Sequence, residues 1–180
     1  MSSVVISGDT SGAITLSAPA VAGTNTITLP ASTGTVVTTG SPASGSIIQV
    51  VGANNTMSNT TMTSTSAVTL GLTASITPKF STSKIYVMAT FSMTQDGQDN
   101  TQSYVYVYRN GSNLKTSGTA LAMYDTPGGN VGFSIPISFY DSPATTSACA
   151  YTIYGSVGSS SSQFRPIAGS DSIVLMEVAA

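Results

Sequence analysis

The most constraining feature of the sequence is a long uncharged stretch, which begins after Asp9 and ends before Lys79. The whole 180-residue chain has 5 Lys and Arg and 7 Asp and Glu, so charged residues make up 7% of it, against about 25% in an average soluble protein. Ser, Thr and Asn side chains could solvate the uncharged stretch, but we favour burial against neighbouring chains. A net charge of −2 offers no clustered cations to phosphates or anionic lipid, so neither nucleic-acid binding nor membrane insertion is expected.

Short apolar runs separated by small polar residues predict an all-β protein. Apolar residues make up 41% of the chain, which is enough for a packed core. The 17 Gly, the 8 Pro and the many Ser and Thr residues favour strands and turns over helices.

A linker rich in Gly and Pro, residues 39–45, divides the chain into an arm of residues 1–44 and a domain of residues 45–180. The arm contains two related elements, ITLSA at 14–18 and ITLPA at 27–31, which alternate apolar and hydroxyl side chains as a strand does. It has no aromatic residue and cannot close a core alone, so we expect it to be anchored on a partner. Every Phe and Tyr lies at or beyond Phe80, which places the core in the second part.

The second part contains roughly eight strands with regularly spaced turns, which predicts a two-sheet sandwich of the jelly-roll type. The predicted strands are 47–51, 67–76, 85–93, 104–108, 119–124, 133–139, 148–154 and 173–178. Pro136 lacks an N–H group, which places its strand at a sheet edge or a bulge. Residues 109–112 indicate a tight hairpin turn, and the lone Cys149 is expected in the core.

Few residues suggest chemistry, and we predict no enzyme activity and no cofactor. The chain has no His, which excludes His-based triads and zinc or haem sites that need His. Asp96 and Asp99 form the closest carboxylate pair and, with Asn100, could hold Ca²⁺, although the turn lacks the spacing of an EF-hand loop. A solvated turn over residues 95–100 is the simpler interpretation.

Three tyrosines, Tyr104, Tyr106 and Tyr108, alternate with two valines and therefore lie on one side of a strand. They could form a cross-strand aromatic ladder, including one at a subunit interface, or stack on the sugar rings of a ligand. The polar stretch of residues 57–66 is compatible with an exposed loop or an edge strand.

Several segments resemble tailed-phage virion fibre proteins, especially those of marine and cyanobacterial phages. In the arm the similar segments are ISGDTSGAITL at 6–16, APAVAGT at 18–24 and TLP at 28–30. In the second part they are GSIIQV at 45–50, SKIYV at 83–87, DSPATT at 141–146 and SIVLMEV at 172–178. The similar segments are spread over nearly the whole chain, from residue 6 to residue 178.

The resemblance implies a homotrimer, in which jelly-roll-like knobs similar to C1q and tumour-necrosis-factor domains are carried on an attachment arm. It implies virion attachment by the arm, for which the candidate side chains are Ile6, Ile14, Leu16, Ile27 and Leu29. The chain start shows no secretion signal, so we expect assembly in the host cytoplasm and localisation in the virion.

The leading hypothesis is a short tail or baseplate fibre that binds other virion proteins and turns its knob loops toward host glycan. A capsid decoration protein, of the cement or head-fibre kind, and a standalone β-sandwich glycan-binding protein remain as alternatives.

Overall fold

The computed structural model describes residues 3–21, 23–26, 28, 31–54, 56–96, 102–114, 123–124, 131–159 and 163–180. Within these residues all regular secondary structure is β, which confirms the predicted all-β class. The chain forms two compact units, Met1–Val36 and Val37–Ala180.

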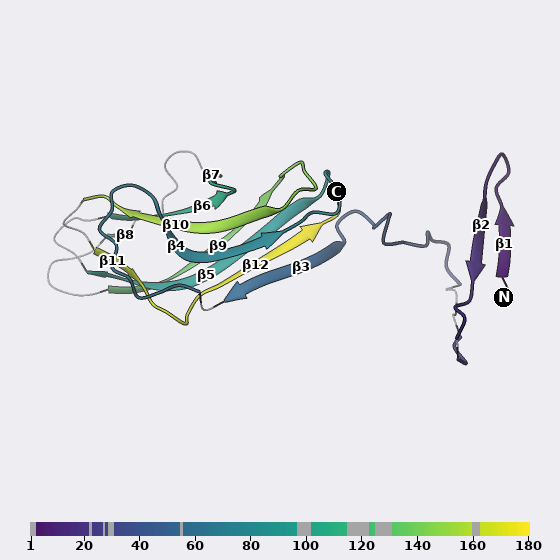
Figure 1. Cartoon of the computed structure of the whole chain (residues 1–180), viewed down its shortest axis with the longest axis horizontal. Helices are drawn as coiled ribbons and strands as arrows, with labels where there is room; N and C mark the ends of the chain where they lie inside the picture. The colour runs from purple at the N-terminus through teal and green to yellow at the C-terminus, as the bar shows by residue number, and fades with distance from the viewer. Residues whose placement is uncertain are drawn as a thin grey trace. The chain divides into compact units, whose positions relative to one another are not determined.

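The first unit contains one antiparallel hairpin, formed by β1 (Ser3–Ser7) and β2 (Ala13–Ser17) and drawn in purple in Figure 1. Its turn is closed by the Gly8 N–H group, which donates to the Gly12 carbonyl at 3.0 Å. Gly12 has a φ of 80°, a conformation in which glycine avoids the steric cost of a side chain. The second predicted β element, at 27–31, lies largely outside the described residues.

The second unit is a sandwich of two antiparallel sheets (Figure 1). Its strands are β3 (Ile47–Asn54), β4 (Val68–Ile76), β5 (Lys84–Asp96), β6 (Gln102–Arg109), β7 (Ser112–Asn113), β8 (Met123–Tyr124), β9 (Val131–Asp141), β10 (Cys149–Val157), β11 (Gln163–Pro166) and β12 (Ser172–Val178). One sheet has the order β3-β12-β5-β9, with β11 also paired to β5, and the other has the order β4-β10-β6, with β7 and β8 paired to β6. Successive long strands alternate between the sheets, and the first pairs with the last, as in a jelly roll.

The core lies between the two sheets and follows the alternation of the strands. Ile85, Val87 and Phe91 on β5, within the predicted strand 85–93, are fully buried and face the β4–β10–β6 sheet. Cys149 is also buried, which confirms its predicted place in the core. Pro136 lies on β9, which pairs only with β5 among the described strands, so its predicted edge position is confirmed.

The hairpin turn at residues 109–112 is present and joins β6 to β7. Asn110 and Gly111 have φ angles of 48° and 80°, and two successive positive φ angles are typical of a type I′ turn. Asn110 is one of the few residue types other than glycine that adopt this conformation readily.

Three sequence expectations need correction or completion. Strand β5 extends to Asp96, which pairs with Gln163 on the unpredicted strand β11, so Gln95 and Asp96 belong to a strand and not to a turn. Residues 57–66 form a loop rather than an edge strand, apart from one bridge residue at Met62. The predicted strand at 119–124 is described only at β8.

The linker predicted at 39–45 lies inside the second unit. The Gly45 N–H group donates to the Ala179 carbonyl, and the Ala179 N–H group donates to the Ser46 carbonyl, each at 2.9 Å. The chain therefore enters β3 beside its own C-terminus, as Figure 1 shows. The domain bounds of 1–44 and 45–180 stay a prediction of the sequence.

Candidate assembly and binding surfaces

One face of the β1–β2 hairpin collects aliphatic side chains. The antiparallel register sets Val4 opposite Leu16 and Ile6 opposite Ile14, and residues two apart on a strand share a face. All four side chains are more than half exposed. The hairpin therefore presents an uncovered apolar face within its own unit.

This face unites three of the predicted attachment residues, Ile6, Ile14 and Leu16. Val4 joins them, although sequence reasoning did not include it; its spacing of two residues from Ile6 is the signal that could have found it. Ile27 and Leu29 lie outside the described residues. The role of these side chains in attachment stays a prediction.

A second uncovered surface is the outer face of the β3-β12-β5-β9 sheet. One row across the sheet consists of Val50, Met176, Tyr86 and Tyr140, and the next row contains Val174 and Met88, as the strand registers require. Val50, Met88 and Tyr140 are 54%, 41% and 62% exposed. The Tyr86 and Tyr140 rings contact each other, with their centroids 4.7 Å apart.

The outer face of this sheet is unusual because it carries few ionic side chains. On a solvated sheet face the outward positions are normally polar. Here Lys84, at the start of β5, and Arg165, on β11, are the two charged side chains among the described outward positions of the sheet. We refer to this surface as the apolar sheet face.

The outer face of the opposite sheet carries the predicted tyrosines. Val105 and Val107 are buried, while Tyr104, Tyr106 and Tyr108 are half-buried on the outer side of β6, as their alternation predicted. Their role in a subunit interface or in glycan binding stays a prediction.

Contacts across β6 and β10 show that Tyr106 and Tyr108 form part of a cross-strand cluster. Tyr108 stacks on Tyr154 with centroids 4.1 Å apart, and the Tyr106 ring meets Tyr108 edge-on at 6.5 Å. The hydroxyls of Tyr106 and Ser156 lie 3.1 Å apart. Sequence reasoning did not single out Tyr154, although the alternation of the predicted strand 148–154 places it on the outer face.

A hollow of about 480 Å³ lies beside this cluster. It is bounded by residues 56–64, by the first residues of β4 and by Pro166. Most of its lining residues are Ser or Thr, the remaining side chains are apolar, and none is charged. Thr69, in the lining, is the cross-strand partner of Tyr154, so the hollow and the tyrosine cluster are adjacent.

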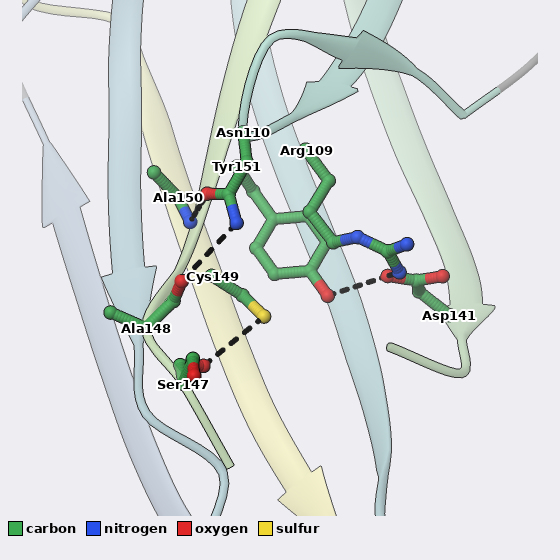
Figure 2. Close-up of polar contacts among 8 residues, drawn as sticks. All are labelled: Arg109, Asn110, Asp141, Ser147, Ala148, Cys149, Ala150 and Tyr151. Carbon is green, nitrogen blue, oxygen red and sulfur yellow. Dashed lines mark hydrogen bonds and ion pairs between the residues drawn. The ribbon is translucent and has the colours of Figure 1, made fainter. Parts of the chain in front are cut away.

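The ion pair between Arg109 and Asp141 has a structural role. Figure 2 shows the Asp141 carboxylate between Arg109 and Tyr151: its Oδ2 accepts from the guanidinium at 2.5 Å and from the phenol at 2.6 Å. Burial, together with these contacts to Asp141, raises the pKa of Tyr151. Burial alone would lower the pKa of Arg109, but the hydrogen bond to Asp141 raises it. The cluster links β6 and β10 of one sheet to β9 of the other.

Two further carboxylates hold loops. Glu177, fully buried, accepts from the Gln49 amide at 2.5 Å and from the backbone N–H groups of Lys79 and Phe80 at 2.7 and 3.2 Å. Burial opposes ionisation of Glu177, but these hydrogen bonds outweigh it and lower the pKa of the carboxyl. The Asp171 carboxylate accepts hydrogen bonds from the backbone N–H groups of Thr56 and Met57, at the start of the 56–64 loop.

No metal or membrane feature emerges from the described part of the chain. Its His, Cys, Asp and Glu side chains form no group of three that could hold a metal ion. The Asp99 candidate for Ca²⁺ lies outside the described residues, as does the side chain of Asp96. The described residues include no helix with the length and apolar character needed to cross a membrane.

No known protein family matches the chain, and no curated protein matches it in sequence. Among solved structures it is similar to a chain of the infectious bursal disease virus Gx strain, with 13% identity and a TM-score of 0.48 over 96% of this chain and 41% of that one. A chain of the T13 particle of the same virus gives 12% identity and a TM-score of 0.47 over 92% and 37%. This chain thus spans about two fifths of the length of those proteins. Likeness at this level does not assign it to a family.

Proposed function

We propose that the chain is a structural virion protein of a tailed phage, a short trimeric tail or baseplate fibre. In this proposal the arm binds another virion protein and the sandwich forms the knob that faces the host. The observation that carries the proposal is the exposed apolar face of the β1–β2 hairpin, formed by Val4, Ile6, Ile14 and Leu16.

The hairpin calls for a partner on physical grounds. A two-stranded hairpin is at best marginally stable alone in water, and each Val, Leu or Ile side chain that becomes buried contributes about 1.5–3 kcal/mol. A complementary apolar groove on a larger particle would both order the hairpin and hold it. The sequence resemblance of residues 6–30 to fibre arms supports a virion protein as the owner of that groove.

The apolar sheet face supports self-association of the knob. Large uncovered apolar patches are rare on monomeric proteins and mark interaction sites. A second copy of the chain is the occupant that is always available, and closed cyclic assemblies satisfy every copy equally. The resemblance of residues 45–50, 83–87 and 172–178 to fibre knobs favours three copies, and these segments contribute to β3, β5 and β12, three of the strands that build this face.

Gold labelling of purified phage particles with antibody against the chain tests the proposal. Label on the tail or baseplate is the expected result. Label on the head shell would replace the fibre by a capsid decoration protein anchored by the same hairpin. Absence of the chain from particles, measured by mass spectrometry of their proteins, would overturn a virion role.

A further inference from the structure

The hollow beside the tyrosine cluster is held open by contacts at both ends of the 56–64 loop. At one end the Asp171 carboxylate accepts from the N–H groups of Thr56 and Met57 at 2.7 and 3.1 Å. At the other end the Ser64 carbonyl accepts from the Val157 N–H group at 2.9 Å. Between them the Asn59 side chain accepts from the Ala168 N–H group at 2.8 Å.

Two methionines and one glycine fix the same loop against the sandwich. Met57 and Met62 are buried and belong to the core. Gly71, on β4, has a φ of 90°, and a side chain there would meet the Thr56 carbonyl at 3.2 Å. The register of β4 with β10 shifts at this point, as it does at a bulge. The loop therefore packs closely on the sheet, and the hollow has fixed walls.

The chemistry of the lining selects one class of small molecule. A volume of about 480 Å³ falls within the range of about 300–1,000 Å³ for small-ligand sites. Hydroxyls such as those of Thr61 and Thr69 both donate and accept hydrogen bonds, whereas an ionic ligand would find no charged partner in the hollow. Met62, Leu70 and Pro166 add apolar contact area.

We propose that this hollow binds a neutral saccharide of one or two rings. Sugar hydroxyls would exchange hydrogen bonds with the Ser and Thr side chains, and the C–H faces of the ring would pack on the apolar part of the lining. Tyr154, opposite Thr69 and held by its stack on Tyr108, supplies an aromatic rim. The inference rests on the proposed function, because it names the ligand class through which the knob contacts the host surface.

Saturation-transfer NMR on the full chain tests the site. The probes are glucose, galactose, mannose, N-acetylglucosamine, maltose, cellobiose and lactose, with glucuronic acid as the anionic comparison. We expect transfer to at least one neutral sugar and none to glucuronic acid. The chain has no Trp, so tyrosine emission provides a second readout of binding near Tyr154.

Variants locate the binding. Thr61 and Thr69 are exposed lining residues, so Thr61→Lys and Thr69→Lys place a bulky charge in the hollow without disturbing the core. Each is expected to weaken the affinity for the bound sugar about tenfold or more. The matched control is Ser75→Lys, on the same strand and the same outer face but outside the lining, and it is expected to bind as the unchanged chain does.

The proposal is overturned if no neutral sugar binds, if both lining variants bind as well as the unchanged chain, or if Ser75→Lys weakens binding equally. Thermal unfolding of all variants identifies any that fail to fold. If one lining variant fails to fold, the other still tests the site. If this binding test fails but the gold label lies on the tail, the saccharide site is excluded and the fibre function is retained. Absence from particles would remove the fibre function whether or not a sugar binds.

Discussion

Three of the chain's 7 acidic residues, Asp141, Asp171 and Glu177, turn their carboxylates inward to accept hydrogen bonds. A buried carboxylate is costly unless its oxygens are hydrogen-bonded, and each of these receives at least two donors. These three carboxylates therefore fix loops and join the sheets, and they do not lie on the outer faces.

Glu177 should make the stability of the sandwich depend on pH in the acid range. Its pKa is lower in the folded protein than in the unfolded chain, where a Glu side chain titrates at about 4.3. The stabilisation is therefore fully present above that value and is lost as the pH falls through the folded pKa. We expect the difference in melting temperature between the unchanged chain and Glu177→Gln to be largest above about pH 5 and to shrink below it, as measured by circular dichroism.

The control is Asp9→Asn, which removes an exposed carboxylate from the arm and should leave the melting temperature unchanged over the same pH range. A difference between Glu177→Gln and the unchanged chain that stays constant from neutral to acid pH would show that ionised Glu177 contributes nothing to stability.

Asp141→Asn should destabilise the sandwich. The change removes the carboxylate charge that both Arg109 and Tyr151 contact, and hydrogen bonds to charged groups contribute about 1.5–3 kcal/mol. A loss of that size corresponds to a fall in melting temperature of roughly 3–12 °C in a chain of this length, measurable by scanning calorimetry. The melting temperature of Tyr151→Phe, which removes only the phenol donor, should fall less than that of Asp141→Asn. Equal losses in both variants would contradict a role for the ion pair.

The sequence of the β1–β2 hairpin specifies a pair of strands, but its exposed side chains do not make the hairpin stable on its own. Its register puts Val4, Ile6, Ile14 and Leu16 on one face, whereas the other face has Ser and Thr residues with Val5 and Ala13. The described residues of the unit cover neither face, so in the proposed function the energy that holds the hairpin in place comes from the virion partner.

Substitution on one hairpin face or the other should separate attachment from folding. Ile14→Asp places a charge in the apolar face and removes the burial of one side chain, about 1.5–3 kcal/mol, or roughly 10- to 100-fold in affinity for the partner. We expect particles with this variant to carry correspondingly less of the protein, measured by quantitative mass spectrometry. Thr15→Asp, on the opposite face, should be incorporated normally. Equal loss in both would show that the apolar face is not the contact.

Strand alternation explains why the elements of the sandwich were predictable while the hollow was not. The runs around Phe91 and Tyr106 alternate strictly, and the structure follows them residue by residue. The 56–64 loop has no such period, because its shape depends on distant partners such as Asp171 and Ala168. Strand β11 was missed because four residues are too few for a periodic signal.

On the scale of the whole chain, association of copies through the apolar sheet face would account for both the low charge and the apolar surface. The apolar sheet face has two charged residues, Lys84 and Arg165, among the described outward positions of its strands. An interface built on such a face gains its energy from apolar burial and not from ion pairs. Its strength should therefore change little with salt, because screening acts on charges.

Self-association through this face is testable on the full chain by analytical ultracentrifugation. We expect a species of three times the 18.2 kDa chain mass, and we expect it to persist from low to high NaCl concentration. Met88→Lys, at an exposed position in the middle of the face, should shift the equilibrium to the monomer, since burying an unpaired ammonium costs several kcal/mol. Ser75→Lys, on the outer face of the other sheet, should remain trimeric. A monomeric unchanged chain, or equal dissociation of both variants, would exclude the apolar sheet face as the interface between copies.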